Sequence, residues 1–339
     1  MRQLSKHVSL KKFNTFGIDT VAENFIEISD NQDIKEAMGW AAEKGYTPII
    51  LGGGSNVLFT KDSYPLIVVN HLLGIKKIKE NEDYVWVESG AGEIWHDLVL
   101  FCLKEGLGGI ENLSLIPGTV GAAPMQNIGA YGVEIKEVFE SLQAVDLSTF
   151  EVKSFNNKEC QFGYRESIFK KELKGKFFIT SLVLKLSKIR KVNISYGAIQ
   201  KVLKDKGILE PTINQVSDAV VHIRQSKLPN PDEIGNAGSF FKNPVISKSR
   251  FEELRQIHSE IPSFPQEDGQ VKVPAGWLIE QCGWKGYCEG SIGVHKKQAL
   301  VLVNYGGGKG AEIEALASKI KDSVYDKFQI NITAEVNIL

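Results

Sequence analysis

The sequence predicts an α+β protein with more than one domain. The chain has 339 residues, which is more than a single hydrophobic core usually organises. Hydrophobic residues make up 42% and charged residues 24%, a balance typical of globular proteins. Short β-rich segments alternate with single helical patterns, and amphipathic helices dominate the last third. We expect three domains, at residues 1–65, 66–205 and 206–339, the last being a smaller α+β domain.

The first expected domain is a strand-helix-strand unit. A strand pattern begins at Phe25, and Asp30 is placed as the N-cap of a helix that Gly45 ends. The strand Thr47–Leu51 then leads into a cluster of glycines.

The other two expected domains mix strands and helices. Strands such as Tyr84–Glu88 and Phe177–Leu186 surround one helix at Ile94–Glu105. The basic stretch Lys188–Gly207 is interpreted as irregular, and a helical pattern follows Pro211, which places a boundary near residue 205. The remaining expected elements are a strand at Ala299–Asn304, helices at Ser249–Glu260, Gly276–Cys282 and Ala311–Phe328, and a C-terminal strand at 330–338 with one apolar face.

Charge and cysteine content exclude several classes of partner. With 40 basic and 41 acidic residues, the formal net charge is -1, so we expect no nucleic-acid or membrane partner. No obligate protein partner is evident. Four cysteines without a C-x-x-C pair predict buried free thiols, and six scattered histidines predict no metal site. The first ten residues contain no apolar run, and we expect a cytoplasmic protein.

The cluster Gly52–Asn56 is a candidate phosphate-binding loop. It follows an apolar strand, and glycines can adopt positive φ and direct consecutive N–H groups at an anion. A tight turn is the alternative interpretation, and Val57 stands where a Rossmann fingerprint needs its third glycine. The later cluster Gly306–Gly310 lacks the Walker pattern and is interpreted as a flexible helix-entry turn.

The segment Ile116–Gly132 alternates glycines with small and amide residues. Such a backbone suits a flat ligand or a pyrophosphate, with Gln126 and Asn127 available for hydrogen bonds. A structural Ω-loop is the alternative.

The order of these two segments resembles the FAD-binding domain of the vanillyl-alcohol-oxidase (PCMH-type) flavoprotein superfamily. Further motifs resemble the UDP-N-acetylenolpyruvoylglucosamine reductase family of bacterial cell-wall synthesis, in the subgroup with an extra tyrosine loop. The resemblance covers essentially the whole chain and rests on Gln126–Gly132, Gly163–Ser167, Ala237–Pro244 and Ala275–Glu280. It implies a two-part FAD-binding domain followed by the substrate-binding domain.

The resemblance also implies an activity and its cofactors. Hydride would pass from NADPH to FAD and then to the enolpyruvyl carbon of UDP-N-acetylglucosamine enolpyruvate, a nucleotide-sugar substrate, to give UDP-N-acetylmuramate for peptidoglycan. Ser55 and Asn56 stand where some superfamily members carry a flavin-linked histidine, so a non-covalent FAD is expected. The implied cofactor contacts are Leu51, Gly52, Gly53, Gly54, Ser55, Asn56, Leu58, Pro117, Gly118, Thr119, Gly121, Asn127, Gly129 and Ile179.

Three residues are carried over as catalytic. Arg165 would stabilise the substrate carboxylate and the developing enolate, since a planar guanidinium fits both. Ser239 would donate the proton, with Lys227 or Lys242 supplying a nearby charge, and Glu335 would position or assist the enolic system. Without the resemblance, these would be a solvated loop arginine, a turn serine and an exposed strand glutamate.

The resemblance further implies substrate contacts. They are Tyr131, Tyr196, Arg224, Lys227, Asn243 and Gln298, with Tyr196 as a covering aromatic ring. One residue departs from the family pattern: Asn337 stands where an arginine usually follows the Glu-Val pair, so that contact cannot be carried over.

Two other functions stay open. A flavin oxidase of the same superfamily would pass electrons to oxygen, and a non-catalytic flavin-binding or nucleotide-binding module would bind FAD without oxidising NADPH. Ser239 and Glu335 argue against both.

Overall fold

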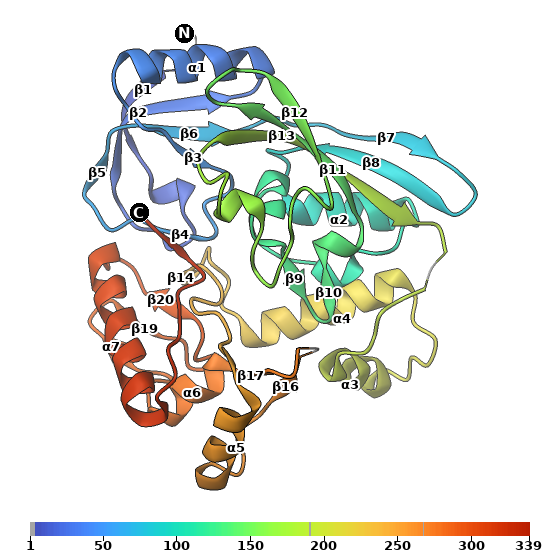
Figure 1. Cartoon of the computed structure of the whole chain (residues 1–339), viewed down its shortest axis with the longest axis vertical. Helices are drawn as coiled ribbons and strands as arrows, with labels where there is room; N and C mark the ends of the chain where they lie inside the picture. The colour runs from blue at the N-terminus through green and yellow to red at the C-terminus, as the bar shows by residue number, and fades with distance from the viewer. Residues whose placement is uncertain (1–3, 190, 267) are drawn as a thin grey trace. The chain divides into compact units, whose positions relative to one another are not determined.

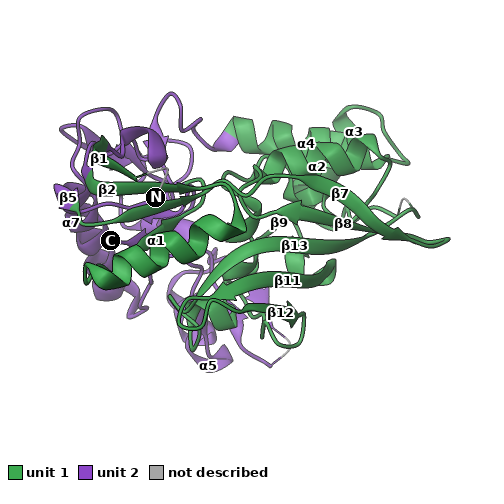
Figure 2. Ribbon diagram, turned by 90° about the horizontal axis from the view of Figure 1, so that it is seen from above, with its two compact units in different colours: residues 1–8, 22–53, 64–226 green, residues 9–21, 54–63, 227–339 purple. Residues whose placement is uncertain are grey.

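The chain forms two compact units. Figure 1 shows the computed structural model, which describes residues 4–189, 191–266 and 268–339. Residues 1–8, 22–53 and 64–226 make up the first unit, and residues 9–21, 54–63 and 227–339 the second (Figure 2). The division differs from the three expected domains, because the chain leaves and re-enters each unit and the helix after Pro211 stays with the first. The three-domain division stays a prediction.

A five-stranded sheet and one helix form the first core of unit 1. The strand order is β1-β2-β6-β3, with β5 paired to β2, and β6 is parallel to both β2 and β3. Helix α1 (Asn31–Glu43) begins at the Asp30 cap, whose side chain accepts from the Gln32 amide, as the sequence predicted. The strands are β1 (Leu4–Ser9), β2 (Val21–Ile28), β3 (Ile49–Leu51), β5 (Ser63–Tyr64) and β6 (Ile67–Asn70).

The second sheet of unit 1 is antiparallel throughout. Its order is β12-β11-β13-β8-β7, and α2 (Trp95–Lys104) buries its apolar side in the same core. The glycine-rich segment 116–132 contributes Val120, Ala123 and Ile128 to this core and ends in the hairpin β9–β10. The strands are β7 (Ile75–Glu80), β8 (Tyr84–Gly90), β9 (Gly129–Ala130), β10 (Val133–Glu134), β11 (Phe139–Asp146), β12 (Val152–Asn156) and β13 (Phe177–Ser187).

The expectation of an irregular segment at 188–207 was wrong for its second half. Residues Gly197–Asp205 form helix α3, which packs on α4 (Ile213–Lys227). Ile199 and Leu203 lie four residues apart and meet Val220 and Ile223 in a small core. The helical spacing was present in the sequence, but the density of lysines concealed it. Arg190 lies outside the described residues.

The described residues of unit 2 include two small antiparallel sheets and the α-helices α5, α6 and α7. The first sheet has the order β14-β20-β19-β18 and the second β15-β17-β16. The three helices lie where the sequence predicted them: α5 (Lys248–Ile257), α6 (Ala275–Gln281) and α7 (Gly310–Phe328), the last entered through the 306–310 turn. The strands are β14 (Gly235–Asn236), β15 (Val245–Ile246), β16 (Phe264–Pro265), β17 (Val271–Lys272), β18 (Cys288–Glu289), β19 (Ile292–Val294) and β20 (Leu302–Asn304).

The C-terminal segment is extended, but it is not the continuous strand expected at 330–338. Ile330, Ile332 and Val336 are buried as the alternation predicted, whereas Ile338 is 40% exposed. Regular pairing is confined to an isolated bridge at Ala334 and to β21 (Asn337–Ile338), which runs parallel to β4 (Val57–Leu58). The segment therefore changes partners along its length, which interrupts a single ladder.

Cysteine burial is mixed. Cys102 and Cys160 are buried free thiols as expected, Cys282 is partly exposed and Cys288 is exposed, which corrects the expectation for that residue. Burial raises the pKa of Cys102 to about 12. Among the described residues, every helix is too short or too polar to span a membrane.

Candidate active site

The two glycine-rich segments meet within unit 1. A Cβ added to Gly53 would lie 2.9 Å from the Gly118 Cα, and one added to Gly52 would overlap the Thr119 hydroxyl. Only glycines at positions 52 and 53 leave room for so close an approach. The two segments therefore pack directly on each other.

The contact between these segments fits a phosphate-bearing cofactor. The Thr119 hydroxyl oxygen is buried and has no hydrogen-bond partner among the described residues. A buried hydroxyl without a partner is costly, and a phosphate oxygen would satisfy it. Val120 and Gly121 donate their amides to Glu93 and Ala91 at 2.8 Å, so these two N–H groups support the loop and not a ligand.

Asn127 lies in the segment 116–132 but is engaged with protein. It is fully buried, with a left-handed φ of 44°. Its amide nitrogen donates to Glu134 at 2.9 Å and to the Gly163 carbonyl at 3.0 Å, and its amide oxygen accepts from Lys136 at 3.2 Å. The side chain therefore joins this segment to the Gly163 turn.

Arg165 lies on a tight turn of unit 1. Gly163 and Glu166 exchange backbone hydrogen bonds of 3.0 and 3.3 Å around it, and its φ of 56° is left-handed. One guanidinium nitrogen donates to the Gly129 carbonyl at 2.8 Å. Arg165 is only partly exposed. A loop arginine held in this way is preorganised rather than freely solvated.

Tyr131, Tyr196 and Arg224 come together in unit 1. The two tyrosine rings meet edge to face with centroids 5.2 Å apart, and the Tyr131 hydroxyl hydrogen-bonds the Arg224 guanidinium. Burial raises the pKa of Tyr131, so its hydroxyl stays protonated near neutral pH, although Arg224 opposes that shift. Arg224 also donates from Nε to the Leu115 carbonyl at 3.1 Å, and burial lowers its pKa.

Ser239 and Glu335 lie on adjacent backbone segments of unit 2. The Glu335 amide donates to the Phe240 carbonyl at 2.8 Å, and Phe241 bridges Ala334. Phe240 is 1% exposed while Ser239 next to it is exposed, so a buried ring anchors the chain beside an accessible hydroxyl. The structure thus brings together two of the three predicted catalytic residues, 96 positions apart in the sequence (335 minus 239).

The end of the glycine loop is hydrogen-bonded to the backbone around Glu335 within unit 2. Asn56 donates from Nδ2 to the Glu335 carbonyl at 3.2 Å. Its own carbonyl accepts from the Asn337 amide at 3.0 Å and from the Asn337 side chain at 2.9 Å. Asn337 therefore fastens the backbone around Glu335 to this loop.

Asn243 and Gln298 flank the start of α6 in unit 2. The Asn243 amide oxygen accepts from the Ala275 amide at 2.9 Å, and the Gln298 amide oxygen accepts from Leu300 at 3.3 Å and lies 3.1 Å from where a Cβ on Gly276 would be. Lys227 is exposed at the end of α4. The side-chain NH₂ groups of both amides can still donate to an anionic ligand.

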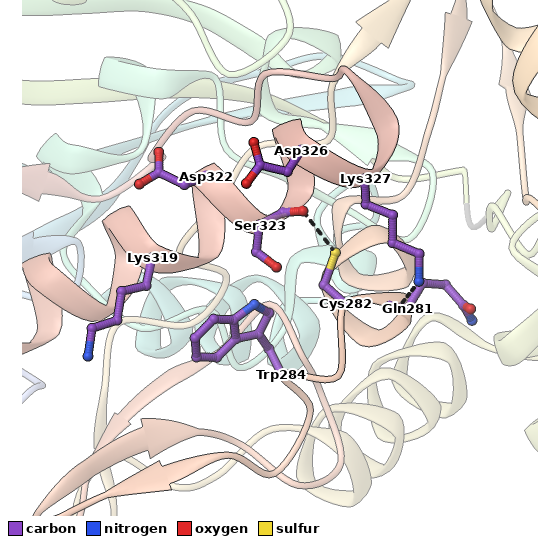
Figure 3. Close-up of a pocket in the computed structure, with 8 residues that line it drawn as sticks. All are labelled: Gln281, Cys282, Trp284, Lys319, Asp322, Ser323, Asp326 and Lys327. Atoms are coloured by element: carbon purple, nitrogen blue, oxygen red, sulfur yellow. Dashed lines mark hydrogen bonds between the residues drawn. The ribbon is translucent and has the colours of Figure 1, made fainter.

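An open hollow of about 740 Å³ lies elsewhere in unit 2 (Figure 3). It is lined from the end of α6, the turn after it and one side of α7, and Cys282 donates there to the Ser323 carbonyl at 3.4 Å. None of the sequence-predicted site residues lines it. The lining residues are Gln281, Cys282, Trp284, Lys319, Asp322, Ser323, Asp326 and Lys327.

Sequence reasoning missed the residues that fasten the site. Asn112 is 1% exposed and donates to two loop carbonyls, and Asn193 closes one of these loops. Neither residue belongs to a motif, and no local signal marks a buried asparagine whose partners lie 19 and 81 positions away.

Two family models match this chain. Residues 22–152 match the FAD binding domain family, and residues 230–339 match the C-terminal domain of UDP-N-acetylenolpyruvoylglucosamine reductase. The chain is similar to proteins with that name from Flavobacterium johnsoniae (51% identity over 99% of this chain and 100% of the relative) and Pseudomonas putida (46% over 99% of each).

A crystal structure of such a reductase from Thermus caldophilus aligns over 98% of both chains with a TM-score of 0.67 and 22% identity. At that level of identity the likeness concerns the fold alone. It confirms the predicted α+β fold, and the family match over residues 22–152 confirms the predicted FAD-binding domain.

Proposed function

Because this chain belongs to the UDP-N-acetylenolpyruvoylglucosamine reductase family, we propose that it reduces UDP-N-acetylglucosamine enolpyruvate to UDP-N-acetylmuramate with electrons from NADPH. The product serves peptidoglycan precursor synthesis. One observation carries the proposal. The backbone next to Ser239 is hydrogen-bonded to Glu335, and Asn56 at the end of the glycine loop is hydrogen-bonded to Glu335 as well. Four free thiols are in keeping with a reducing compartment, and we place the protein in the cytoplasm.

The chain holds FAD non-covalently through its glycine-rich segments. When bound, FAD accepts hydride from NADPH and supplies it to the substrate. The close approach of Gly53 to Gly118 and the buried Thr119 hydroxyl support phosphate binding by this part of unit 1. The remaining assigned cofactor residues stay a proposal.

Each catalytic residue has one task in this reaction. One carbon of the enolpyruvyl double bond takes up the hydride, and the Ser239 hydroxyl donates a proton to the other, so that one hydride and one proton together add two electrons and two hydrogens to the double bond. Arg165 stabilises the negative charge that develops on the carboxylate side of the substrate. Glu335 holds the enolic system in position, and the bonds of Asn56 and Asn337 fix its backbone.

The substrate also carries a nucleotide diphosphate. We assign its recognition to Lys227, Arg224, Asn243 and Gln298, with Tyr131 and Tyr196 as aromatic contacts. Arg224 is held by Leu115 and Tyr131, which leaves its orientation fixed before any ligand binds.

An anaerobic visible spectrum of the purified protein tests the function. Flavin bands should bleach with NADPH and return when UDP-N-acetylglucosamine enolpyruvate is added. A flavin that stays reduced until air enters would favour an oxidase, and one that NADPH does not bleach would favour a non-catalytic binding module. A protein with no flavin band after FAD addition would overturn the proposal.

A further inference from the structure

Two tyrosines assigned to the substrate lie on separate loops of unit 1. Tyr131 follows β9 in a left-handed conformation with φ 51°, and Tyr196 is the N-cap residue of α3. Tyr131 is half-buried against the core between α3 and α4, whereas Tyr196 is 42% exposed. The edge-to-face contact of their rings means that Tyr131 supports one side of the exposed ring.

A single buried side chain joins these loops. Asn112 lies in the 3₁₀ turn Glu111–Leu113 and is 1% exposed. Its amide nitrogen donates to the Tyr131 carbonyl at 3.0 Å and to the Asn193 carbonyl at 2.9 Å. Both hydrogens of one rigid NH₂ group are thus used to set the spacing of the two loops.

Asn193 adds a return contact. Its amide nitrogen donates to the Gly132 carbonyl at 3.1 Å, and its amide oxygen accepts from the Ser195 amide and hydroxyl at 3.0 and 2.7 Å. Gly132 has a φ of +84°, and a Cβ there would lie 3.2 Å from the Ser195 hydroxyl. We call Asn112, Asn193 and the two loop segments 131–132 and 193–196 the tyrosine latch.

The environment of the Asn112 side chain is unfavourable for folding, which indicates that this residue has a specific task. Its amide oxygen is buried without a hydrogen-bond partner among the described residues. An unpaired buried acceptor disfavours folding, so the residue is a poor choice for stability alone. Its two donated bonds instead fix one arrangement of the loops.

We propose that Asn112 is a positioning residue that acts through Tyr196: it holds the 193–196 loop so that the exposed ring covers the nucleotide part of the substrate. This inference rests on the proposed function. Because Asn112 is only 1% exposed, we infer that its effect on substrate binding passes through the loops that it joins.

Steady-state kinetics of the full-length flavoprotein test the latch. Asn112→Leu keeps the approximate shape and removes both donors. Two neutral hydrogen bonds correspond to a loss of about tenfold to thirtyfold in binding. We expect the KM for UDP-N-acetylglucosamine enolpyruvate to rise by that factor, with kcat within about threefold and flavin reduction by NADPH unchanged.

Ser114→Ala is the matched control. Ser114 lies just after the same 3₁₀ turn, is fully buried and loses hydrogen bonds to Glu111 at 2.8 Å and Ser217 at 2.7 Å without touching either loop. It should leave the KM unchanged. An equal KM increase in the control would overturn the latch, because loss of any buried bond would then suffice.

A double-mutant cycle with Tyr196→Ala gives the deciding readout. If Asn112 acts through Tyr196, the double variant has a KM within about twofold of Tyr196→Ala alone. If the KM increases of the two single variants multiply in the double variant, the two residues act independently and the inference is overturned. Should Asn112→Leu fail to fold, the smaller Asn112→Ala, which removes the same two donated bonds, enters the same cycle with the same two outcomes.

The wild-type protein separates this inference from the proposed function. If its NADPH-reduced flavin is not reoxidised by the enolpyruvyl substrate, both statements fail. If reoxidation is normal but the effects of the Asn112 and Tyr196 substitutions on KM are independent, only the proposal about the latch fails.

Discussion

Gly54 offers a sharp test of how the glycine loop is held. Its φ is +60°, and a Cβ at this position would overlap the carbonyl oxygen of Phe13, a backbone atom that cannot rotate away. Gly17, also in unit 2, has a nearly equal φ of +64° and nothing within 4 Å of its Cβ position. The two glycines therefore share the conformational demand and differ in the contact.

The expected magnitudes follow from that difference. An alanine in the left-handed region costs about 1–2 kcal/mol, which is the whole effect expected for Gly17→Ala. Overpacking against a fixed neighbour adds about 1–3 kcal/mol, so Gly54→Ala should lose about 2–5 kcal/mol in total. The Thr15 amide donates to the Gly54 carbonyl at 3.2 Å, so displacement of the loop also strains that bond.

Urea denaturation of the flavin-free proteins measures these losses, and fluorescence titration measures FAD affinity. Gly54→Ala should bind FAD at least tenfold more weakly, since a shift of 1.4 kcal/mol in the loop suffices for that factor. Gly17→Ala should bind FAD normally. Equal destabilisation of the two variants, or normal FAD affinity in Gly54→Ala, would refute the reasoning.

Three further results are expected. Ser239→Ala should still accept hydride from NADPH but lose turnover by roughly a hundredfold, as for removal of a general acid; single-turnover absorbance separates the two steps, and normal turnover would exclude the serine. Glu335→Gln should abolish turnover while FAD binding persists, since the backbone contacts of residue 335 with Asn56 and Phe240 are kept, and full activity would remove Glu335 from the mechanism. At pH 8, iodoacetamide should modify exposed Cys288 but not Cys102, whose pKa burial raises to about 12; mass spectrometry of the native protein would show any contrary labelling.

Local chemistry made several elements readable from the sequence. The Asp30 cap, the apolar run of β8 and the helical spacing of α7 each act within a few residues, so their signals survive without tertiary context. The motifs around Arg165, Ser239 and Glu335 were likewise readable as a resemblance. Helix α3 was missed because the stretch is rich in lysine and its apolar spacing is short. That spacing stabilises the helix only when α4 packs against it.

The sequence by itself determined the fold class, the family and the chemical types of the candidate residues. Only the tertiary structure decided which backbones fasten them, because these contacts join distant positions: Asn56 reaches Glu335 across 279 residues, and Asn112 reaches Asn193 across 81. A sequence shows a hydrogen-bond donor but not its acceptor, because the acceptor is brought to it only when the chain folds. The close packing of Gly53 on Gly118 and the parallel pairing of β21 with β4 are unreadable for the same reason.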